Sequence, residues 1–317
     1  MRDRILGYLR DSEFVSGESM ADELGISRTA VWKHVNSLKA MGYDIESVKN
    51  KGYRLVSSPD KPISEEVTRD LGTEIIGSEV RYLPTIDSTN ILGKELARSK
   101  IPEGCVIVAD EQTMGRGRKN RSWSSPKGGL WFSVILYPDL PPERGMLVTM
   151  MTSISVAEAV KELTGIDPVI KWPNDLLIKG KKVCGILTEL DAEMDRIESS
   201  VIGIGINVNN EIDPDLADIG TSLKNVSGKV VSRVDLIRSV LKHMDENYGS
   251  IRRGDHDSIR SRWLELSRIT GRKIRHTGPK GIRTGTVLDI DDSGCIIMKI
   301  GGGSERIVSG DVEYLDD

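Results

Sequence analysis

The sequence predicts a multidomain α+β protein, and three observations lead to this fold class. The chain has 317 residues, which exceeds the usual size of one domain, so two or three domains are expected. Residues 1–56 space their apolar side chains as helices do and end in a predicted β-hairpin. Residues 63–266 mix helical and strand patterns, and residues 268–317 hold short β-type runs separated by turns, typical of a small β-barrel or sandwich.

Residues 1–56 are predicted to form a winged helix-turn-helix. Apolar stripes at helical spacing indicate three helices, of which the third begins after the N-cap residue Ser27 and ends at Gly42. Two helices joined by a tight glycine-containing turn are the elements of a helix-turn-helix. Residues 44–55 then have the pattern of a hairpin, which would be the wing, and residues 57–62 are a predicted linker with two prolines.

The third predicted helix and the wing present basic and polar side chains that suit a DNA duplex. Such a helix would contact base edges and phosphates in the major groove, while the wing contacts the backbone. The alternative is that the lysines and arginines only solvate a helix surface, but the cap, the turn and the wing occur together and favour DNA binding. The predicted DNA-binding residues are Arg28, Thr29, Trp32, Lys33, Asn36, Lys49 and Lys51.

The composition restricts the partners and the cellular context. The net charge is -4, so any binding of DNA must come from a local basic patch. No stretch approaches 18 uninterrupted apolar residues and the first residues are charged, which argues against a membrane span and a secretory signal. The three cysteines and four histidines are scattered, so the sequence predicts a cytoplasmic protein without disulfides or a metal site.

The segment 63–266 is predicted to be a mixed α/β domain, and its strongest chemical signal is the loop 111–123. Two glycines and four cations lie within residues 115–121, and backbone NH groups beside glycine together with arginines suit phosphate or carboxylate. On composition alone, an exposed basic loop that binds nucleic acid is equally consistent. Asn120 stands where the third glycine of a dinucleotide fingerprint would be, and no G-x-x-x-x-G-K-[ST] motif occurs, so ATP would bind in another manner.

Four further segments are specific only in combination. Residues 87–90 precede a helical run, residues 171–175 form the pentapeptide KWPND, and residues 182–187 and 203–208 carry glycines within β-type runs. Glycines inside strands indicate that another group lies close to the backbone, and here we expect that group to be a ligand. Each segment also has an ordinary explanation as a helix cap, a turn or a bend.

In this order along the chain, the segments resemble those of biotin–protein ligases. The matching residues are Ser88-Thr89-Asn90, Gly115-Arg116-Gly117-Arg118, Arg121, Trp123, Lys171 to Asp175, Lys182 to Leu187 and Gly203 to Asn207. The first segment of the chain, through Gly52-Tyr53-Arg54-Leu55, resembles the winged helix of the bifunctional ligase–repressors. The resemblance covers essentially the whole chain and implies three domains, with the DNA-binding domain at 1–60, the ligase catalytic domain at 63–267 and a small SH3-like β-barrel at 268–317.

The resemblance implies a reaction in two steps. ATP with Mg²⁺ would convert biotin into biotinyl-5′-AMP and pyrophosphate, and a specific lysine of a biotin carboxyl carrier protein would then displace AMP. In the ligase–repressors the adenylate also favours a homodimer that binds operator DNA, so the chain would act as a biotin-responsive repressor. The alternatives are a lipoate ligase of similar fold, a non-enzymatic ligand-sensing regulator that binds DNA, and a winged helix that makes only protein contacts.

The resemblance also implies roles for the site residues. The biotin-binding residues would be Ser88, Thr89, Asn90, Gln112, Arg116, Gly117, Arg118 and Lys182. The catalytic residues would be Lys182, which bridges the biotin carboxylate and the α-phosphate, Arg116 and Arg118, which cover the ligand, and Asp175, which orients the attacking lysine. Gly115, Arg121, Trp123 and the polar stretch 209–222 would enclose the adenylate. The chain has Asn120 where many members have glycine, and asparagine tolerates left-handed backbone.

Overall fold

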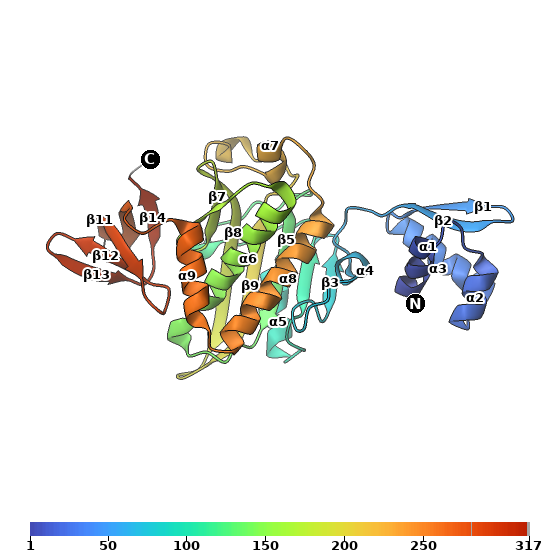
Figure 1. Cartoon of the computed structure of the whole chain (residues 1–317), viewed down its shortest axis with the longest axis horizontal. Coiled ribbons are helices and arrows are strands. Elements are labelled where there is room, and N and C mark those ends of the chain that lie inside the picture. The colour runs from blue at the N-terminus through green and yellow to red at the C-terminus, as the bar shows by residue number, and fades with distance from the viewer. Residues whose placement is uncertain (280, 316–317) are drawn as a thin grey trace. The chain divides into compact units, whose positions relative to one another are not determined.

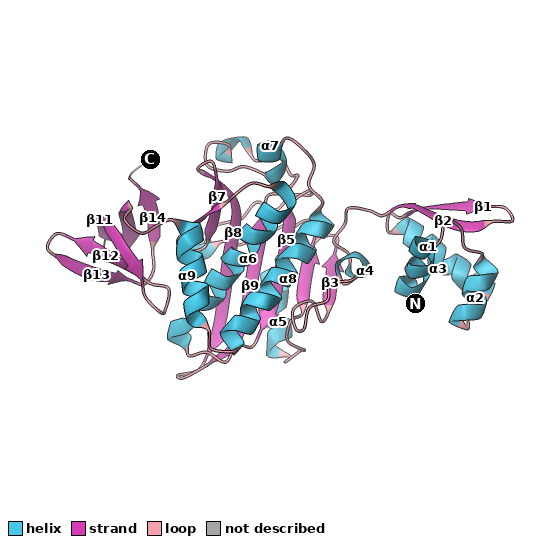
Figure 2. Ribbon diagram, in the orientation of Figure 1, coloured by secondary structure: helices cyan, strands magenta, loops and turns pink. Residues whose placement is uncertain are grey.

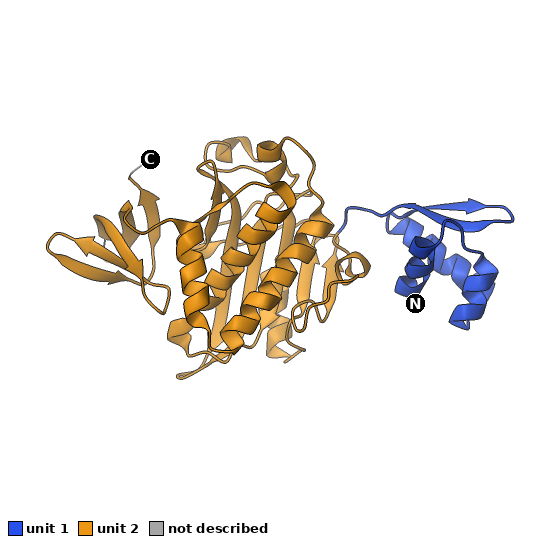
Figure 3. Cartoon of the chain, viewed as in Figure 1, with its two compact units in different colours: residues 1–61 blue, residues 62–317 orange. Residues whose placement is uncertain are grey.

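A computed structural model of the chain describes residues 1–279 and 281–315 (Figure 1). The chain divides into two compact units, residues 1–61 and residues 62–317, which are described separately (Figure 3). In the described part of the chain, no helix combines the length and the apolar character that a membrane crossing needs.

The first unit contains the predicted three helices and a hairpin, which forms the wing (Figure 2). The side chain of Ser16 caps the second helix by accepting a hydrogen bond from the backbone of Ser19, and Ser27 caps the third helix in the same way. Gly25 ends the second helix in the left-handed conformation. The elements are α1 (Arg2–Asp11), α2 (Gly17–Leu24), α3 (Arg28–Ala40), β1 (Asp44–Val48) and β2 (Gly52–Ser57).

The second unit is built on a seven-stranded sheet with the strand order β3-β4-β5-β9-β8-β7-β6. The β3–β4 pair is parallel and the other pairs are antiparallel, so the sheet is mixed. The predicted strands at 104–109, 130–136 and 199–208 correspond to β4, β5 and β9. The strands are β3 (Val80–Leu83), β4 (Val106–Ala109), β5 (Leu130–Leu136), β6 (Val169–Lys171), β7 (Asp175–Ile178), β8 (Lys181–Ala192) and β9 (Ile197–Ile206).

Helices cover both faces of this sheet, and the alternation of side chains along the strands decides which residues meet which helices. Ile202 and Ile204 of β9 belong to the main core, whereas Val201 packs in a smaller cluster with the apolar side of α5. Gly203 and Gly205 therefore face the side of α5, away from α6 and α8. The helices are α4 (Ser64–Val67), α5 (Thr89–Arg98), α6 (Met146–Thr164), α7 (Leu223–Ser227), α8 (Arg233–Arg252) and α9 (His256–Ser267).

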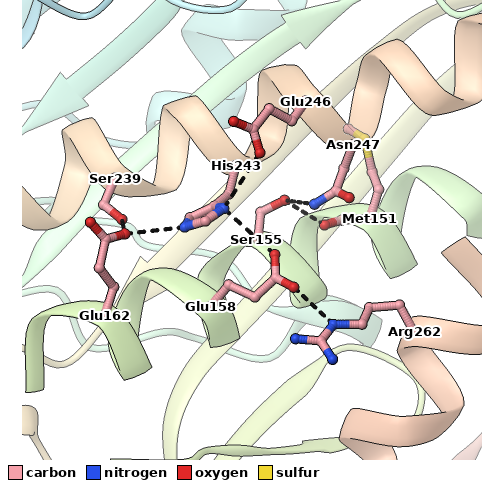
Figure 4. A network of polar contacts seen from close by, with 9 residues as sticks. All are labelled: Met151, Ser155, Glu158, Glu162, Ser239, His243, Glu246, Asn247 and Arg262. Carbon is pink, nitrogen blue, oxygen red and sulfur yellow. Dashed lines mark hydrogen bonds and ion pairs between the residues drawn. The ribbon is translucent and has the colours of Figure 1, made fainter. Parts of the chain in front are cut away.

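A polar network joins α6, α8 and α9 on the helical face (Figure 4). His243 of α8 lies between two carboxylates of α6, with Nε2 3.1 Å from Glu162 and Nδ1 3.6 Å from Glu158. Glu158 also accepts a hydrogen bond of 2.9 Å from Arg262 of α9. The hydrogen bond from Ser239 is the main cause that lowers the pKa of Glu162, with a smaller effect from His243. These contacts align the three helices at their polar edge.

The C-terminal strands form a separate five-stranded antiparallel sheet with the order β13-β12-β11-β10-β14. Its buried residues Val287 and Met298 join the main core of the unit. The predicted closed SH3-like barrel is not confirmed, because among the described residues β14 pairs with β10 instead of returning to β13, which leaves the sheet open. The strands are β10 (Lys273–Gly278), β11 (Gly281–Ile290), β12 (Ile296–Ile300), β13 (Gly303–Ile307) and β14 (Asp311–Tyr314).

Candidate active site

A cavity of about 130 Å³ lies on the side of the seven-stranded sheet that faces α5. It is bounded by the N-terminus of α5, the loop after β4, and strands β7, β8 and β9, with one residue from β14. The loop side chains are exposed or half-buried, so the cavity opens to solvent. The sequence-predicted residues that line it are Ser88, Thr89, Asn90, Gln112, Arg116, Gly117, Arg118, Arg121, Trp123, Asp175 and Lys182.

A second cavity of about 280 Å³ adjoins the first and is lined by residues of the segment 207–220. The two cavities share Arg121, Ser122, Trp123 and Lys182. The shared side chains therefore stand at a junction between one chamber near α5 and another near residues 207–220. Such a composite pocket suits two ligands that must meet at the junction.

The loop that covers the first cavity folds back on itself through two isolated β-bridges, Gln112 with Ser125 and Arg116 with Ser122. The amide of Gln112 donates to the Ser125 carbonyl at 3.1 Å, and the amide of Trp123 donates to the Gly115 carbonyl at 2.8 Å. Gly115 does not line the cavity and supports Trp123 from within the loop, and its role in enclosing the adenylate stays a prediction. At the tip, residues 118–120 form a short 3₁₀ turn (η1, Arg118–Asn120), and Asn120 has φ +57°. Asparagine thus adopts the left-handed conformation that was expected of it.

The glycines within the strands make room for side chains of the protein itself. A β-carbon at Gly205 would overlap the indole nitrogen of Trp123, and one at Gly185 would lie 2.9 Å from the same ring. Gly185 and Gly205 are cross-strand partners, so together they form a flat seat for Trp123. A β-carbon at Gly203 would overlap the side-chain oxygen of Asn90. The sequence correctly predicted a close approach, and the approaching groups of the protein are Trp123 and Asn90. The same glycines line the first cavity, and their contact with a ligand stays a prediction.

A chain of hydrogen bonds organises the floor of the first cavity. The side-chain oxygen of Gln112 accepts from the amide of Thr89 at 2.9 Å and lies 3.1 Å from its hydroxyl. The Gln112 amide group donates to Ser125 Oγ at 2.9 Å. Ser133 Oγ lies 2.7 Å from Thr89 Oγ1 and 2.6 Å from Asn90 Oδ1. Because their rotamers are held in this way, the polar groups are in place before any ligand arrives.

The side chain of Asn90 is directed into the protein. Its amide nitrogen donates to the Leu187 carbonyl at 3.2 Å and to Glu189 at 3.0 Å. Glu189 in turn forms an ion pair with Lys94 at 3.0 Å. Asn90 therefore ties α5 to β8 and supports the cavity wall, and its direct contact with a ligand stays a prediction.

Lys182 occupies the junction between the two cavities because of an irregularity in β8. The β7–β8 ladder shifts register between Leu176 and Leu177, and this bulge changes the direction of the side chains at the start of β8. The Lys182 ammonium lies 2.7 Å from Asp175 Oδ1 and 5.0 Å from the centre of the Trp123 ring. Both charged side chains are partly buried, so the pair is less screened than a surface ion pair.

The KWPND pentapeptide, which includes the cis Trp172–Pro173 bond, connects this pair to the loop. Asn174 makes two hydrogen bonds with the backbone of Ile186 in β8. Its side-chain amide donates to the Ile186 carbonyl at 2.6 Å, and its backbone carbonyl accepts from the Ile186 amide at 2.9 Å. Arg118 donates to Asn174 Oδ1 at 3.1 Å. Burial lowers the pKa of Arg118, and the charges of Asp311 and Asp175 oppose that effect.

Asp311 is a cavity residue that sequence reasoning missed. It begins β14, and its Oδ2 lies 2.7 Å from Arg121 and 3.1 Å from Lys119 of the loop. Burial by itself would raise the pKa of Asp311, but the hydrogen bonds from these two cations outweigh it, so the pKa is lowered. No motif marks the position, since only the tertiary fold brings residue 311 next to residues 119–121.

Within the described residues, no group of three or more His, Cys, Asp or Glu side chains is arranged to hold a metal ion. The second cavity contains two carboxylates, Glu211 and Asp213, next to the amides of Asn207 and Asn210.

In the first unit, the predicted DNA-binding residues of α3 and the wing are all exposed. Trp32 is 54% exposed, so it does not pack within the helices. The buried side of α3 consists of Val31, Val35 and Leu38. The predicted DNA-binding side chains are therefore accessible to a partner.

Comparison with known proteins is consistent with both halves of this arrangement. A family described as the biotin/lipoate A/B protein ligase family matches residues 82–207, and an HTH domain family matches residues 2–54. The bifunctional ligase/repressor BirA of Bacillus spizizenii is 42% identical over 306 residues, which cover 95% of this chain and 94% of the relative. The BirA protein of Escherichia coli is 29% identical and covers 98% of this chain and 95% of its own length. The structure of the biotin protein ligase from Aquifex aeolicus in complex with biotin and ATP aligns with a TM-score of 0.65 at 31% identity, over 75% of this chain and 98% of that chain.

Proposed function

The chain belongs to the biotin/lipoate A/B protein ligase family, among its bifunctional ligase/repressors, and we propose that one composite pocket carries out both steps of its ligase reaction. The chain converts biotin and ATP into biotinyl-5′-AMP and pyrophosphate, and transfers biotin to a lysine of a biotin carboxyl carrier protein with release of AMP. It also represses transcription in response to biotin. The observation that carries the proposal is the pair of adjoining cavities with Lys182 and Trp123 at their junction.

In the first step, biotin occupies the cavity near α5 and the nucleotide occupies the cavity near residues 207–220. Ser88, Thr89 and Gln112 face the biotin head group from a prearranged hydrogen-bond chain. The Lys182 ammonium then lies where the biotin carboxylate attacks the α-phosphate. Negative charge gathers at this point in the transition state, and a cation that is already in place stabilises it without further reorganisation.

Magnesium with ATP would neutralise charge on the phosphates when it is bound. Mg²⁺ keeps several water ligands and takes few from protein, so a site with one or two carboxylates is sufficient. Glu211 and Asp213 in the second cavity fit that requirement and would hold the ion.

In the second step, the loop 112–125 protects the adenylate from water until the acceptor lysine arrives. Arg116 and Arg118 cover the first cavity, and Arg118 is partly buried against Asn174. Asp175 would orient and deprotonate the acceptor amine. It is paired with Lys182 at 2.7 Å, and once the adenylate draws Lys182 towards its phosphate the carboxylate is available to the acceptor.

The choice between biotin and lipoate provides the direct test of the substrate. Pyrophosphate release from ATP should require biotin, while lipoate at the same concentration should support little release. Release with lipoate and not with biotin would place the chain among the lipoate ligases. Binding of biotin without any release would leave only a ligand-sensing regulator.

Replacing Gly205 by alanine is expected to displace the Trp123 indole from its seat between β8 and β9. Overpacking of this kind typically costs about 1–3 kcal/mol, so kcat/KM for adenylate formation should fall on the order of tenfold or more. The measurement is pyrophosphate release as a function of biotin and ATP concentrations. Gly302→Ala is the control, because a β-carbon there meets nothing within 4 Å. Equal activity of the two variants would mean that adenylate formation does not depend on the position of the Trp123 indole against Gly205.

The winged unit should bind DNA with a strong dependence on salt. Lys33→Ala and Lys51→Ala each remove an exposed cation from α3 or the wing. Each loss of a phosphate contact should weaken binding and reduce the slope of log K against log salt by about one. Fluorescence anisotropy with an operator duplex measures both, and Lys229→Ala, an exposed lysine of the other unit, is the control. A winged unit that shows no salt-dependent DNA binding makes only protein contacts.

Further features of the assembly complete the proposal. A homodimer that forms when the adenylate is bound would present two winged helices to two operator half-sites. The domain boundaries are at 60–63 and 267–268, and the C-terminal sheet is of the SH3-like type. Three buried thiols without disulfides are consistent with a cytoplasmic location.

A further inference from the structure

The two walls of the composite pocket are attached to the same short segment, residues 231–233, at the start of α8. The first wall is the loop 110–129, and the second is the segment 207–220. Among the residues that line the two cavities, none comes from this α8 segment. Its contacts nevertheless reach the base of both walls.

Arg233 holds both ends of the first wall. Its NH1 nitrogen donates to Asp110 Oδ1 at 3.0 Å, where the loop leaves β4, and to the carbonyl of Gly129 at 3.3 Å, where the loop enters β5. The side chains of Arg233 and Asp110 are only 10% and 12% exposed. The second oxygen of Asp110 accepts a hydrogen bond from Tyr82, so the carboxylate is fixed from both sides. A buried, charge-assisted pair of this kind has a defined geometry.

The second wall is attached to Val231, which lies two residues before Arg233. The side-chain amide of Asn209 donates to the Val231 carbonyl at 2.8 Å, and its oxygen accepts from the Val231 amide at 3.0 Å. The backbone amide of Asn209 also donates to the carbonyl of Gly128 at 2.9 Å. Gly128 has φ +98°, which favours glycine and allows the two backbones to approach. The two walls are thus joined to each other and to residues 231–233.

We propose that Arg233 is a positioning residue that sets the biotin wall and the nucleotide wall in register, so that losing its guanidinium impairs the binding of both substrates together. The proposal rests on the proposed function, which assigns one wall to biotin and the other to ATP. Arg233 fixes both ends of the biotin wall from beneath the pocket, and this wall is in turn hydrogen-bonded to the nucleotide wall through Gly128 and Asn209. Lysine would keep the charge, but it replaces the planar guanidinium, whose NH1 nitrogen serves both ends of the loop, by a compact ammonium on a flexible stem.

The test compares Arg233→Lys with the wild-type chain in two measurements. In steady-state pyrophosphate release, KM for biotin and KM for ATP should both rise on the order of tenfold, with kcat changed by less than about threefold. In hydrogen exchange without ligands, amides in residues 110–129 and in residues 207–213 should both exchange faster. Asn209→Ala, which breaks the other attachment, should give the same joint pattern and serves if Arg233→Lys does not fold.

Arg238→Lys is the matched control, because Arg238 lies on the same helix and its ion pair is with Asp235 one turn away. It should leave both KM values and both exchange rates close to wild type. A rise in only one KM, faster exchange in only one wall, or a lower unfolding temperature with unchanged KM values would overturn the proposal. The exchange measurement needs no activity, so failure of the ligase assignment would appear separately as absent pyrophosphate release in the wild-type chain.

Discussion

Replacement of Lys182 by methionine is expected to lower the rate of biotinyl-adenylate formation by about 10²–10³-fold. Methionine keeps an unbranched stem next to Trp123 but removes the ammonium at the junction of the two cavities. Loss of one prearranged electrostatic contact to a developing charge costs about 3–4 kcal/mol of transition-state stabilisation. Pyrophosphate release at saturating biotin and ATP measures the effect, which should appear mainly in kcat.

Lys181→Met is the control for this variant, because Lys181 is exposed and its ammonium donates to the Ala217 carbonyl on the surface. It should retain nearly the full rate. If Lys182→Met forms the adenylate as fast as Lys181→Met, then the ammonium at the junction has no part in the chemistry and the proposed role of Lys182 is wrong.

Replacement of Arg118 by alanine is expected to release the adenylate from the enzyme about 10–100 times faster. The Arg118 guanidinium links the covering loop to Asn174, and it also donates to the carbonyl of Gly310, the residue before β14. Hydrogen bonds from charged groups contribute about 1.5–3 kcal/mol each, so the loop should open more often without them. Adenylate that escapes is hydrolysed and yields AMP even when no acceptor is present. The measurement is therefore the amount of AMP formed without acceptor, divided by the amount of biotin transferred when acceptor is present.

Lys119→Ala provides the comparison, since Lys119 is at the loop tip and its exposed pair with Asp311 contributes little to stability. That variant should keep the wild-type ratio of AMP to transferred biotin. An unchanged ratio for Arg118→Ala as well would show that the loop retains the adenylate by other contacts.

The sequence identified most of the candidate pocket because its residues lie in short, contiguous motifs. Residues 88–90, 115–123 and 182–187 each belong to a local turn or strand, and each motif contributes residues to the first cavity. The spacing of glycines in β8 and β9 also predicted a close approach to the backbone. It did not reveal that Trp123 makes the approach, because the position of a loop over a sheet depends on tertiary contacts.

Contacts between segments that are distant in the sequence could not be predicted from the sequence. Asp311 meets Arg121 across 190 positions of sequence, and Arg233 meets Asp110 across 123. Single charged residues in ordinary strands and helices carry no local pattern that would single them out. The open C-terminal sheet was missed for a similar reason, because strand pairing is a non-local choice that short β-type runs do not specify.

We propose that one composite pocket both makes and holds biotinyl-5′-AMP and passes biotin to a protein lysine. The most direct test incubates the chain with labelled biotin and ATP, removes free ligand, and then adds a biotin carboxyl carrier domain with or without its acceptor lysine. We expect one equivalent of label bound to each enzyme molecule, and this label should move to the domain only when the lysine is present. Enzyme that retains unmodified biotin, with no pyrophosphate released and no label transferred, would contradict it.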